Sequence, residues 1–431
     1  MILAGLATVL LGVSVFVFRS GGRRYLANPL VAFFGIWAGV LLLSRLAHFN
    51  IELTSAGTRL TGTAFLALAF GSIAGVWLWS RRSRKRASDD VAARSIMFVA
   101  MASLPLFAIC VAWKFGMAWS VVGIPFAHVH EIRASGLAGD IATPFVIRGM
   151  VVFGYLAALN LGVLWAVRPS RWVLVLSLTL GILLFLNDLS IGARGSLFNG
   201  GLLMASAEIV AGAGRARGVW RVAHAIGIVV FVTLAASMIF WLRSSNEGPT
   251  SLGGVTGSAV AYASGAVPAS GWFIDNPWPT AVPGQWSFAG LWQLVDVVTG
   301  ALPASYDQSF QTRWAPVTGA FNTGTFITYF YSDFGIPGVI ILSVLTGFAA
   351  GYLFIGAART RRLMLMELGA LALFTLTFTP RGYIWSGMVF WPLTVAVVAQ
   401  PFLLRWASRI RLPWQPALVP QPAISGASDE T

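Results

Sequence analysis

The side chains best suited to chemistry in this sequence are arginines that stand on short polar segments between apolar runs. Arg194 is the clearest of them, because it lies in the stretch NDLSIGARGSLFNGG, with a glycine close on each side and an apolar run directly after it. A guanidinium at the start of a helix can bind an anion together with unpaired backbone N–H groups. The spacing therefore predicts an anion site at Arg194, one that a pyrophosphate would fit. Pairing with Asp188, or contact with lipid headgroups, is the structural alternative.

A second candidate region is the long stretch RWAPVTGAFNTGTFITYFYSDFGIPGVIILSVLTG at 313–347. Arg313 opens it, and Tyr329 and Tyr331 follow, so the region offers groups that can contact phosphate and sugar hydroxyls. Asp333 precedes an apolar helix that we expect to begin directly after it. A carboxylate in that place can act as a general base, or it can cap the helix ahead of a glycine and a proline.

Histidines and a glutamate crowd together in the sequence HVHE, which contains His128, His130 and Glu131. Two histidines at i and i+2 with one carboxylate are not a recognised zinc spacing, so we expect no metal site and no cofactor. Glu131 or His130 could instead act as a general base, with Arg133 as a second anion contact. Simple solvation of these polar residues is the structural alternative.

Arg148 and Arg381 lie near the ends of apolar runs, where a cation is costly unless it has a partner or a task. Both could line the cavity that binds the anion, and both could equally anchor the chain at a membrane interface. The polar segment 243–334 is rich in aromatic residues, whose flat faces could stack on sugar rings. Trp and Tyr also collect at membrane interfaces. These aromatic residues are Tyr262, Trp272, Trp278, Trp286, Trp292, Tyr306 and Trp314.

The composition shows which class of protein can position these residues. Of 431 residues, 57% are hydrophobic and 10% are charged, and the mean hydropathy is +0.77. A soluble domain carries roughly 25% charged residues, so a soluble globular fold is excluded. The net charge is +14, but no basic block has the interleaved aromatic residues of a nucleic-acid surface, and we expect no nucleic-acid partner. Cys110 is the only cysteine, so an intrachain disulfide is excluded.

Apolar runs of membrane-spanning length recur along the chain. A span needs about 20 apolar residues, and the runs predict an all-α, polytopic integral membrane protein with about 11 transmembrane helices in contact with a lipid bilayer. The predicted spans are 1–18, 25–44, 62–80, 95–113, 143–167, 172–188, 197–213, 222–242, 335–356, 363–379 and 383–404.

Basic residues fall in every second connection between these runs. Those connections hold 20 of the 29 Lys and Arg residues. By the positive-inside rule they face the cytoplasm, which puts the N-terminus outside and the C-terminus inside. Arg194, Arg313 and the other candidates then belong to the opposite, extracytoplasmic side.

The spans divide the chain into four parts. Residues 1–242 form transmembrane helices 1–8, 243–334 form one large extracytoplasmic loop, 335–404 form helices 9–11, and 405–431 form a cytoplasmic tail that we expect to be disordered. The sequence contains no GxxxxGK[ST] phosphate loop, no GxGxxG after a strand and no DxD pair. These features favour a function on the outer side of the membrane without a nucleotide.

Two motifs resemble the bacterial oligosaccharide repeat unit polymerases, the O-antigen polymerase (Wzy-type) family. They are IGARGSL at 191–197 and NTGTFITYFYSDFGIPGVIILSVLTG at 322–347, which begins with Asn322. Arg313 and Gly324 also match the pattern of Arg, ten residues and Gly that is described for the large outer loops of such polymerases. The same pattern from Arg194 fails, since Ala205 occupies the glycine position.

The resemblance implies a GT-C-like architecture and a defined reaction in the bacterial cytoplasmic (inner) membrane, with the active site facing outward. A glycan linked to polyprenyl pyrophosphate would pass to a sugar hydroxyl of another lipid-linked repeat unit, releasing polyprenyl pyrophosphate. Arg194 first and Arg313 second would stabilise the leaving pyrophosphate. Asp333, Glu131 and His130, in that order, are the candidate bases, and a flippase and a chain-length regulator are the implied protein partners.

Two other functions fit the same arrangement of predicted spans and one large outer loop. The first is an O-antigen ligase, which would transfer a finished glycan to a lipid core. The second is a flippase or secondary transporter for a lipid-linked saccharide, which would need ionisable residues at membrane depth facing a central path. Glu208 is a rare ionisable residue within a predicted span, and the concentration of polar groups outside the spans favours an enzyme.

Overall fold

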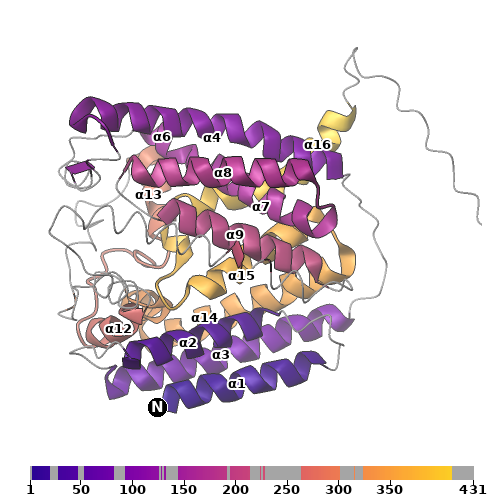
Figure 1. Ribbon diagram of the computed structural model, residues 1–431. Coiled ribbons are helices and arrows are strands. Elements are labelled where there is room, and N and C mark those ends of the chain that lie inside the picture. The colour runs from indigo at the N-terminus through magenta and orange to yellow at the C-terminus, as the bar shows by residue number, and fades with distance from the viewer. Residues whose placement is uncertain are drawn as a thin grey trace, which may run out of the picture.

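The chain folds into a bundle of long α-helices with short helices gathered at one end (Figure 1). The computed structural model describes residues 2–19, 28–46, 53–81, 93–125, 128, 131–132, 144–191, 195–213, 224, 227–228, 264–300, 315 and 324–409. Within these ranges the regular elements are helices, which agrees with the predicted all-α class.

The long helices are α1 (Ile2–Arg19), α2 (Pro29–Leu46), α3 (Ser55–Arg81), α4 (Ala93–Val122), α7 (Val151–Val167), α8 (Arg171–Leu189), α9 (Gly195–Gly212), α14 (Phe326–Thr360), α15 (Leu363–Phe378) and α16 (Phe390–Arg409). The short helices are α6 (Phe145–Gly149), α12 (Ala266–Asp275), α13 (Ala289–Thr299) and η4 (Ile384–Ser386). Every predicted span overlaps one of the long helices except 222–242, of which the structure describes only residues 224, 227 and 228.

Five helices of the described chain are long and apolar enough to cross a membrane, namely Ser55–Trp79, Ala93–Val122, Val146–Val167, Arg171–Leu189 and Phe326–Thr360. Their outward faces carry large apolar side chains that a soluble protein would bury. Phe70, Phe98 and Ile182 are 68%, 67% and 60% exposed, for example. Exposed apolar surface of this extent suits a lipid environment, because water would penalise it.

Successive long helices alternate in direction between two ends of the bundle from α1 to α9, and again from α14 to α16 (Figure 1). We call one of them the arginine end, because it holds the α7–α8 and α14–α15 connections with Arg168, Arg171, Arg361 and Arg362. We call the other the loop end, because α6, α12 and α13 gather there (left in Figure 1). The two basic connections that the structure describes between long helices thus lie at the same end of the molecule.

Glycines bring α3 and α14 into close contact. A Cβ atom on Gly71 would clash with the carbonyl oxygen of Val344, and one on Gly347 would clash with the carbonyl oxygen of Leu68. Gly75 and Gly351 make the same kind of approach one turn later on each helix, so both helices contribute a GxxxG pattern. Small residues at this spacing let transmembrane backbones approach closely, and van der Waals packing then holds them together.

Helix α14 begins earlier than the sequence predicts. Its first turn starts at Phe326, whereas the prediction starts the helix just after Asp333. The backbone breaks at Gly335, whose φ of 63° and ψ of −154° are not helical, and Pro337 follows in the next segment. The conformation at Gly335 is one that only glycine adopts readily. The predicted helix boundary therefore corresponds to a kink within α14, and a short helical segment lies ahead of it.

Candidate functional site

The start of α9 is held by the end of α8 at the loop end. Asp188 accepts hydrogen bonds from the backbone N–H of Ser196 at 2.9 Å and of Leu197 at 2.8 Å. The sequence predicts that backbone N–H groups beside Arg194 are open to an external anion. That prediction is wrong for these two groups, because the Asp188 carboxylate already occupies them. Asp188 therefore acts as the internal anion of the α9 N-terminus, where the helix dipole favours negative charge.

A buried lysine extends this cluster. Lys114 of α4 is 6% exposed, and its Nζ donates to Oδ1 of Asn187 at 2.9 Å. Asn187 in turn donates from Nδ2 to the Ser196 hydroxyl at 2.8 Å. Lys114 also interacts electrostatically with Asp188 and with Arg148. A buried carboxylate needs a nearby cation to offset its loss of hydration, and Lys114 supplies it.

We call Lys114, Asn187, Asp188 and Ser196 the α9-start cluster. The polar contacts continue through Asn199, whose Nδ2 donates to the Tyr155 hydroxyl at 3.4 Å. The Tyr155 ring stacks on Phe390 with ring centroids 5.7 Å apart and an angle of 11° between the planes. The start of α9 is thereby linked through α7 to the first residue of α16, which follows the 379–389 segment.

The α14 start forms a second cluster at the loop end, built around Asp333. Its carboxylate accepts hydrogen bonds from the backbone N–H of Trp286 at 3.1 and 3.2 Å and of Ser287 at 2.6 Å. Asp333 thus binds the segment between α12 and α13, and it does not serve as the N-cap of the helix that follows. Both carboxylate oxygens are engaged by amide donors, an arrangement that suits a structural carboxylate better than a proton acceptor.

Aromatic packing closes this second cluster. Tyr329 is 4% exposed, and its ring lies 5.2 Å from the Trp278 ring. Trp278 also packs against Trp286, at 5.1 Å. The predicted sugar contact at Tyr329 is therefore not open to a ligand in this conformation, whereas Tyr331 is partly exposed. Arg381 is also partly exposed and follows α15 directly, in the segment that contacts Tyr329 through Gly382.

A histidine that the sequence reasoning did not select makes a polar pair after α4. His128 Nδ1 lies 2.9 Å from Glu131 Oε1, and both side chains are exposed, at 41% and 56%. A carboxylate on one ring nitrogen orients an imidazole so that the other nitrogen can exchange a proton. The pair is three residues apart, so helical spacing was the signal in HVHE that pointed to His128.

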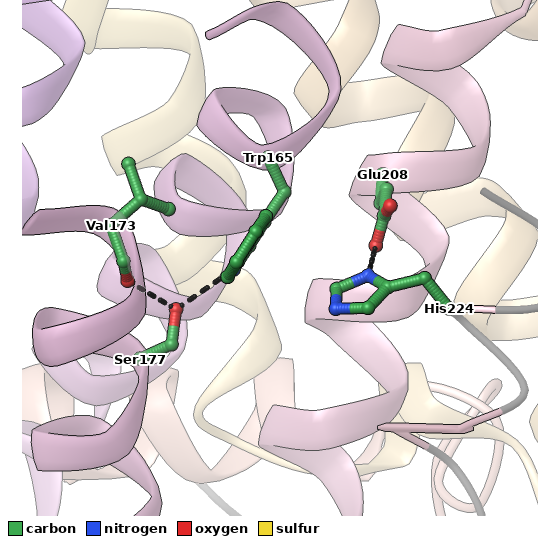
Figure 2. Close-up of polar contacts among 5 residues, drawn as sticks. All are labelled: Trp165, Val173, Ser177, Glu208 and His224. Atoms are coloured by element: carbon green, nitrogen blue, oxygen red, sulfur yellow. Dashed lines mark hydrogen bonds and ion pairs between the residues drawn. The ribbon is translucent and has the colours of Figure 1, made fainter. Parts of the chain in front are cut away.

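A separate feature lies toward the arginine end, where Glu208 and His224 form a close pair (Figure 2). Glu208 is 3% exposed, and its Oε2 lies 2.6 Å from Nδ1 of His224. The Trp165 ring lies 4.8 Å from the His224 ring and donates from Nε1 to the Ser177 hydroxyl. Trp165, Ser177 and His224 border a mainly apolar cavity of about 290 Å³ between α8 and α9. The cavity is lined chiefly by Leu178, Leu184, Leu197, Gly200 and Met204.

The other predicted site residues are divided between the described and the undescribed parts of the chain. Arg194, Arg313, Asn322, His130 and Arg133 lie outside the described residues. Arg148 is exposed on α6 beside the α9-start cluster, and Gly195 follows Arg194 directly into α9. In the part of the chain that the structure describes, no group of three or more His, Cys, Asp or Glu residues is arranged to hold a metal ion. The sequence matches no family model, no curated protein and no solved structure.

Proposed function

We propose that the protein polymerises oligosaccharide repeat units linked to polyprenyl pyrophosphate, on the outer face of the bacterial cytoplasmic membrane. The growing glycan passes to a hydroxyl of a lipid-linked acceptor, the bond from its terminal sugar to the pyrophosphate breaks, and polyprenyl pyrophosphate leaves. The acceptor proton goes to a base on the protein. The reaction consumes no nucleotide, because the pyrophosphate leaving group supplies the driving force.

One observation carries the proposal. Two basic side chains, Lys114 and Arg148, lie together at the loop end beside the first turn of α9, and Arg194 directly precedes that turn. Lys114 is committed to Asn187 and Asp188, so it holds the α9 start in place. Arg194 and Arg148 are then the cations for the pyrophosphate, and we assign Arg313 and Arg381 to the donor as further cations. Fixed guanidinium groups beside a lipid-facing site stabilise a leaving phosphate strongly, because little water screens them.

The structure changes the order of the candidate bases. Asp333 holds backbone N–H groups with both oxygens, so we assign it a positioning role at the α14 start. His128, oriented by Glu131, becomes the preferred base, since its other ring nitrogen can accept the proton of an acceptor hydroxyl. His130 stays a candidate base of the same segment, and Arg133 stays a candidate anion contact.

The test is the polymer profile of cells that carry single arginine variants. We expect Arg194→Ala and Arg313→Ala to reach the membrane in normal amounts while single repeat units accumulate and polymer disappears. Arg171→Ala is the matched control, because Arg171 lies at the arginine end and should leave the polymer unchanged. Normal polymer from Arg194→Ala would remove Arg194 from the mechanism. A glycan transferred to a lipid core instead of to a second repeat unit would favour the ligase.

A transporter for the same lipid-linked saccharide is the second candidate, and buried ionisable residues favour it. Lys114, Glu208 and Glu367 are 6%, 3% and 0% exposed within long helices. From the sequence, Glu208 is the only such residue that is expected within a span. The described helices therefore contain more buried ionisable groups than the sequence predicts. Ionisable residues in such places commonly mark ion or substrate paths. A transporter would move the lipid-linked glycan across vesicle membranes without lengthening it.

A further inference from the structure

A carboxyl group in the interior of the bundle lacks the partners that a charge would need. Glu367 lies in the second turn of α15, and none of its surface is exposed. Its Oε1 accepts one hydrogen bond from Gln400 Nε2 of α16, at 3.2 Å. Its Oε2 is buried and has no hydrogen-bond partner within the described residues. The group therefore has one neutral donor and one unused oxygen.

The two amides beside Glu367 have no further donors to offer. Gln400 Nε2 also donates to Asn160 Oδ1 of α7 at 2.8 Å, which uses its second hydrogen. Asn160 Nδ2 donates to Gln400 Oε1 at 3.2 Å and to the Leu156 carbonyl at 2.9 Å. Both amides are thus fully engaged, with Asn160 and Gln400 0% and 3% exposed. No hydrogen of this network is left to stabilise a negative charge on Oε2.

The charged side chains that the structure describes on the surrounding helices do not supply the missing partner. Helices α2, α7, α9, α14 and α16 pack against α15. On these helices Arg45, Arg359 and Arg405 are exposed, and Glu208 is paired with His224. Gln400 is the only side chain found to interact with the Glu367 carboxyl in the described structure. An ionised carboxylate in such a place would lose its hydration without a compensating cation.

We propose that Glu367 is a proton-binding site in the interior of the membrane-embedded bundle, with the proton held on Oε2 and the Gln400 hydrogen bond kept on Oε1. A proton taken from water converts the carboxylate to a neutral acid, so no other reactant is needed. The amide oxygens of Asn160 and Gln400 already accept hydrogen bonds from each other, which favours a proton over a larger cation that needs several oxygen ligands. Because Glu367 lies near the first residue of α15, the nearest solution is that at the arginine end. The proposal is independent of the transferase reaction.

Infrared spectroscopy of the full-length protein in lipid vesicles at neutral pH tests the proposal. The C=O stretch of a protonated carboxyl is separate from the bands of a carboxylate. We expect a protonated-carboxyl band that is absent in Glu367→Gln and moves to higher frequency in Gln400→Leu, because the bonded oxygen loses its donor. Glu208→Gln is the matched control, since Glu208 is an equally buried acid that has a histidine partner, and it should leave this band in place.

Two results would overturn the proposal. The first is loss of a carboxylate band, and not of a protonated-carboxyl band, in Glu367→Gln at neutral pH. The second is failure of Glu367→Gln to fold into the membrane while Glu208→Gln folds, because glutamine reproduces the size and neutrality of the protonated acid. The transferase proposal would stand in both cases, since it is tested by the polymer profile of the arginine variants.

Discussion

Two aspartates at the loop end each bind the backbone N–H groups of another segment. Asp188 binds the first backbone N–H groups of α9, and Asp333 binds those of the segment between α12 and α13. A carboxylate that accepts several amide hydrogen bonds fixes a turn of backbone more firmly than a neutral side chain does. Both residues come from the motifs in which the sequence predicts chemistry, and for both the structure gives a positioning role.

Replacement of Asp188 should destabilise the fold. Asp188→Ala leaves two buried backbone donors without their acceptor, and it removes the negative charge that offsets the buried Lys114 ammonium. Each buried donor left unsatisfied costs about 1–3 kcal/mol, so the free energy of unfolding should fall by at least about 2 kcal/mol. Thermal unfolding in detergent measures the loss. Asp275→Ala, which changes an exposed aspartate at the end of α12, should unfold like the natural protein. Equal stability of the two variants would contradict the role of Asp188.

Variants of Asp333 can show whether this residue positions the loop or acts as the base. Asparagine keeps an oxygen that can accept the Trp286 and Ser287 N–H groups, but it cannot take a proton at neutral pH. Asp333→Asn should therefore keep most of the polymerising activity, with an unchanged pH profile, while Asp333→Ala loses it with the fold of the loop. A general base contributes about 10²–10⁴-fold to a rate. A loss of that size in a stably folded Asp333→Asn would assign the base to Asp333.

At the scale of the helices, the apolar runs were easy to predict and their contacts were not. Runs of about 20 apolar residues dominate any window average, so the long helices follow from the sequence. The same averaging conceals single polar residues within a run, and Glu367 in the predicted span 363–379 is such a residue. Helices α12 and α13 were also missed, because 10 and 11 residues are too few to give a clear period within a polar segment.

The close contact between α3 and α14 predicts that a larger side chain at one of its glycines destabilises the fold. Gly347→Leu should separate the two backbones, because even a Cβ there meets the Leu68 carbonyl. Overpacking of this kind costs about 1–3 kcal/mol or more, so the folded fraction after heating should drop. Size-exclusion chromatography in detergent measures that fraction. Gly35→Leu on α2 is the control, since nothing lies within 4 Å of a Cβ at Gly35. If both variants behave alike, the close contact is not what holds these helices.

At the scale of the whole molecule, the arginine end and the loop end of the bundle differ in what they contain. The arginine end gathers basic connections, and the loop end gathers short helices, aromatic clusters and the two aspartate anchors. The alternation of basic connections along the sequence predicts that they share one end, and the two connections that the structure describes, α7–α8 and α14–α15, do so. Which predicted site residues meet could not be predicted, because it depends on contacts between segments far apart in sequence, such as Lys114 with Asn187.

Orientation in the membrane can be measured with single introduced cysteines. Cys110 is fully buried, so a membrane-impermeant maleimide should leave the natural protein unlabelled. Val298→Cys places a thiol on an 82% exposed position of α13 at the loop end, and Pro169→Cys places one in the α7–α8 connection at the arginine end. We expect labelling of Val298→Cys in intact spheroplasts and of Pro169→Cys only after lysis. The reverse pattern would put the loop end in the cytoplasm and exclude an outward-facing transferase.

The central claim is that cations at the loop end hold a lipid diphosphate while its glycan is transferred. Its most direct test is incubation of the purified full-length protein with lipid-linked repeat units, in the absence of nucleotide, followed by sizing of the glycan. We predict glycans of several repeat units together with released polyprenyl pyrophosphate. Repeat units that stay single while the protein is folded, or that only change their side of the vesicle membrane, would contradict the account.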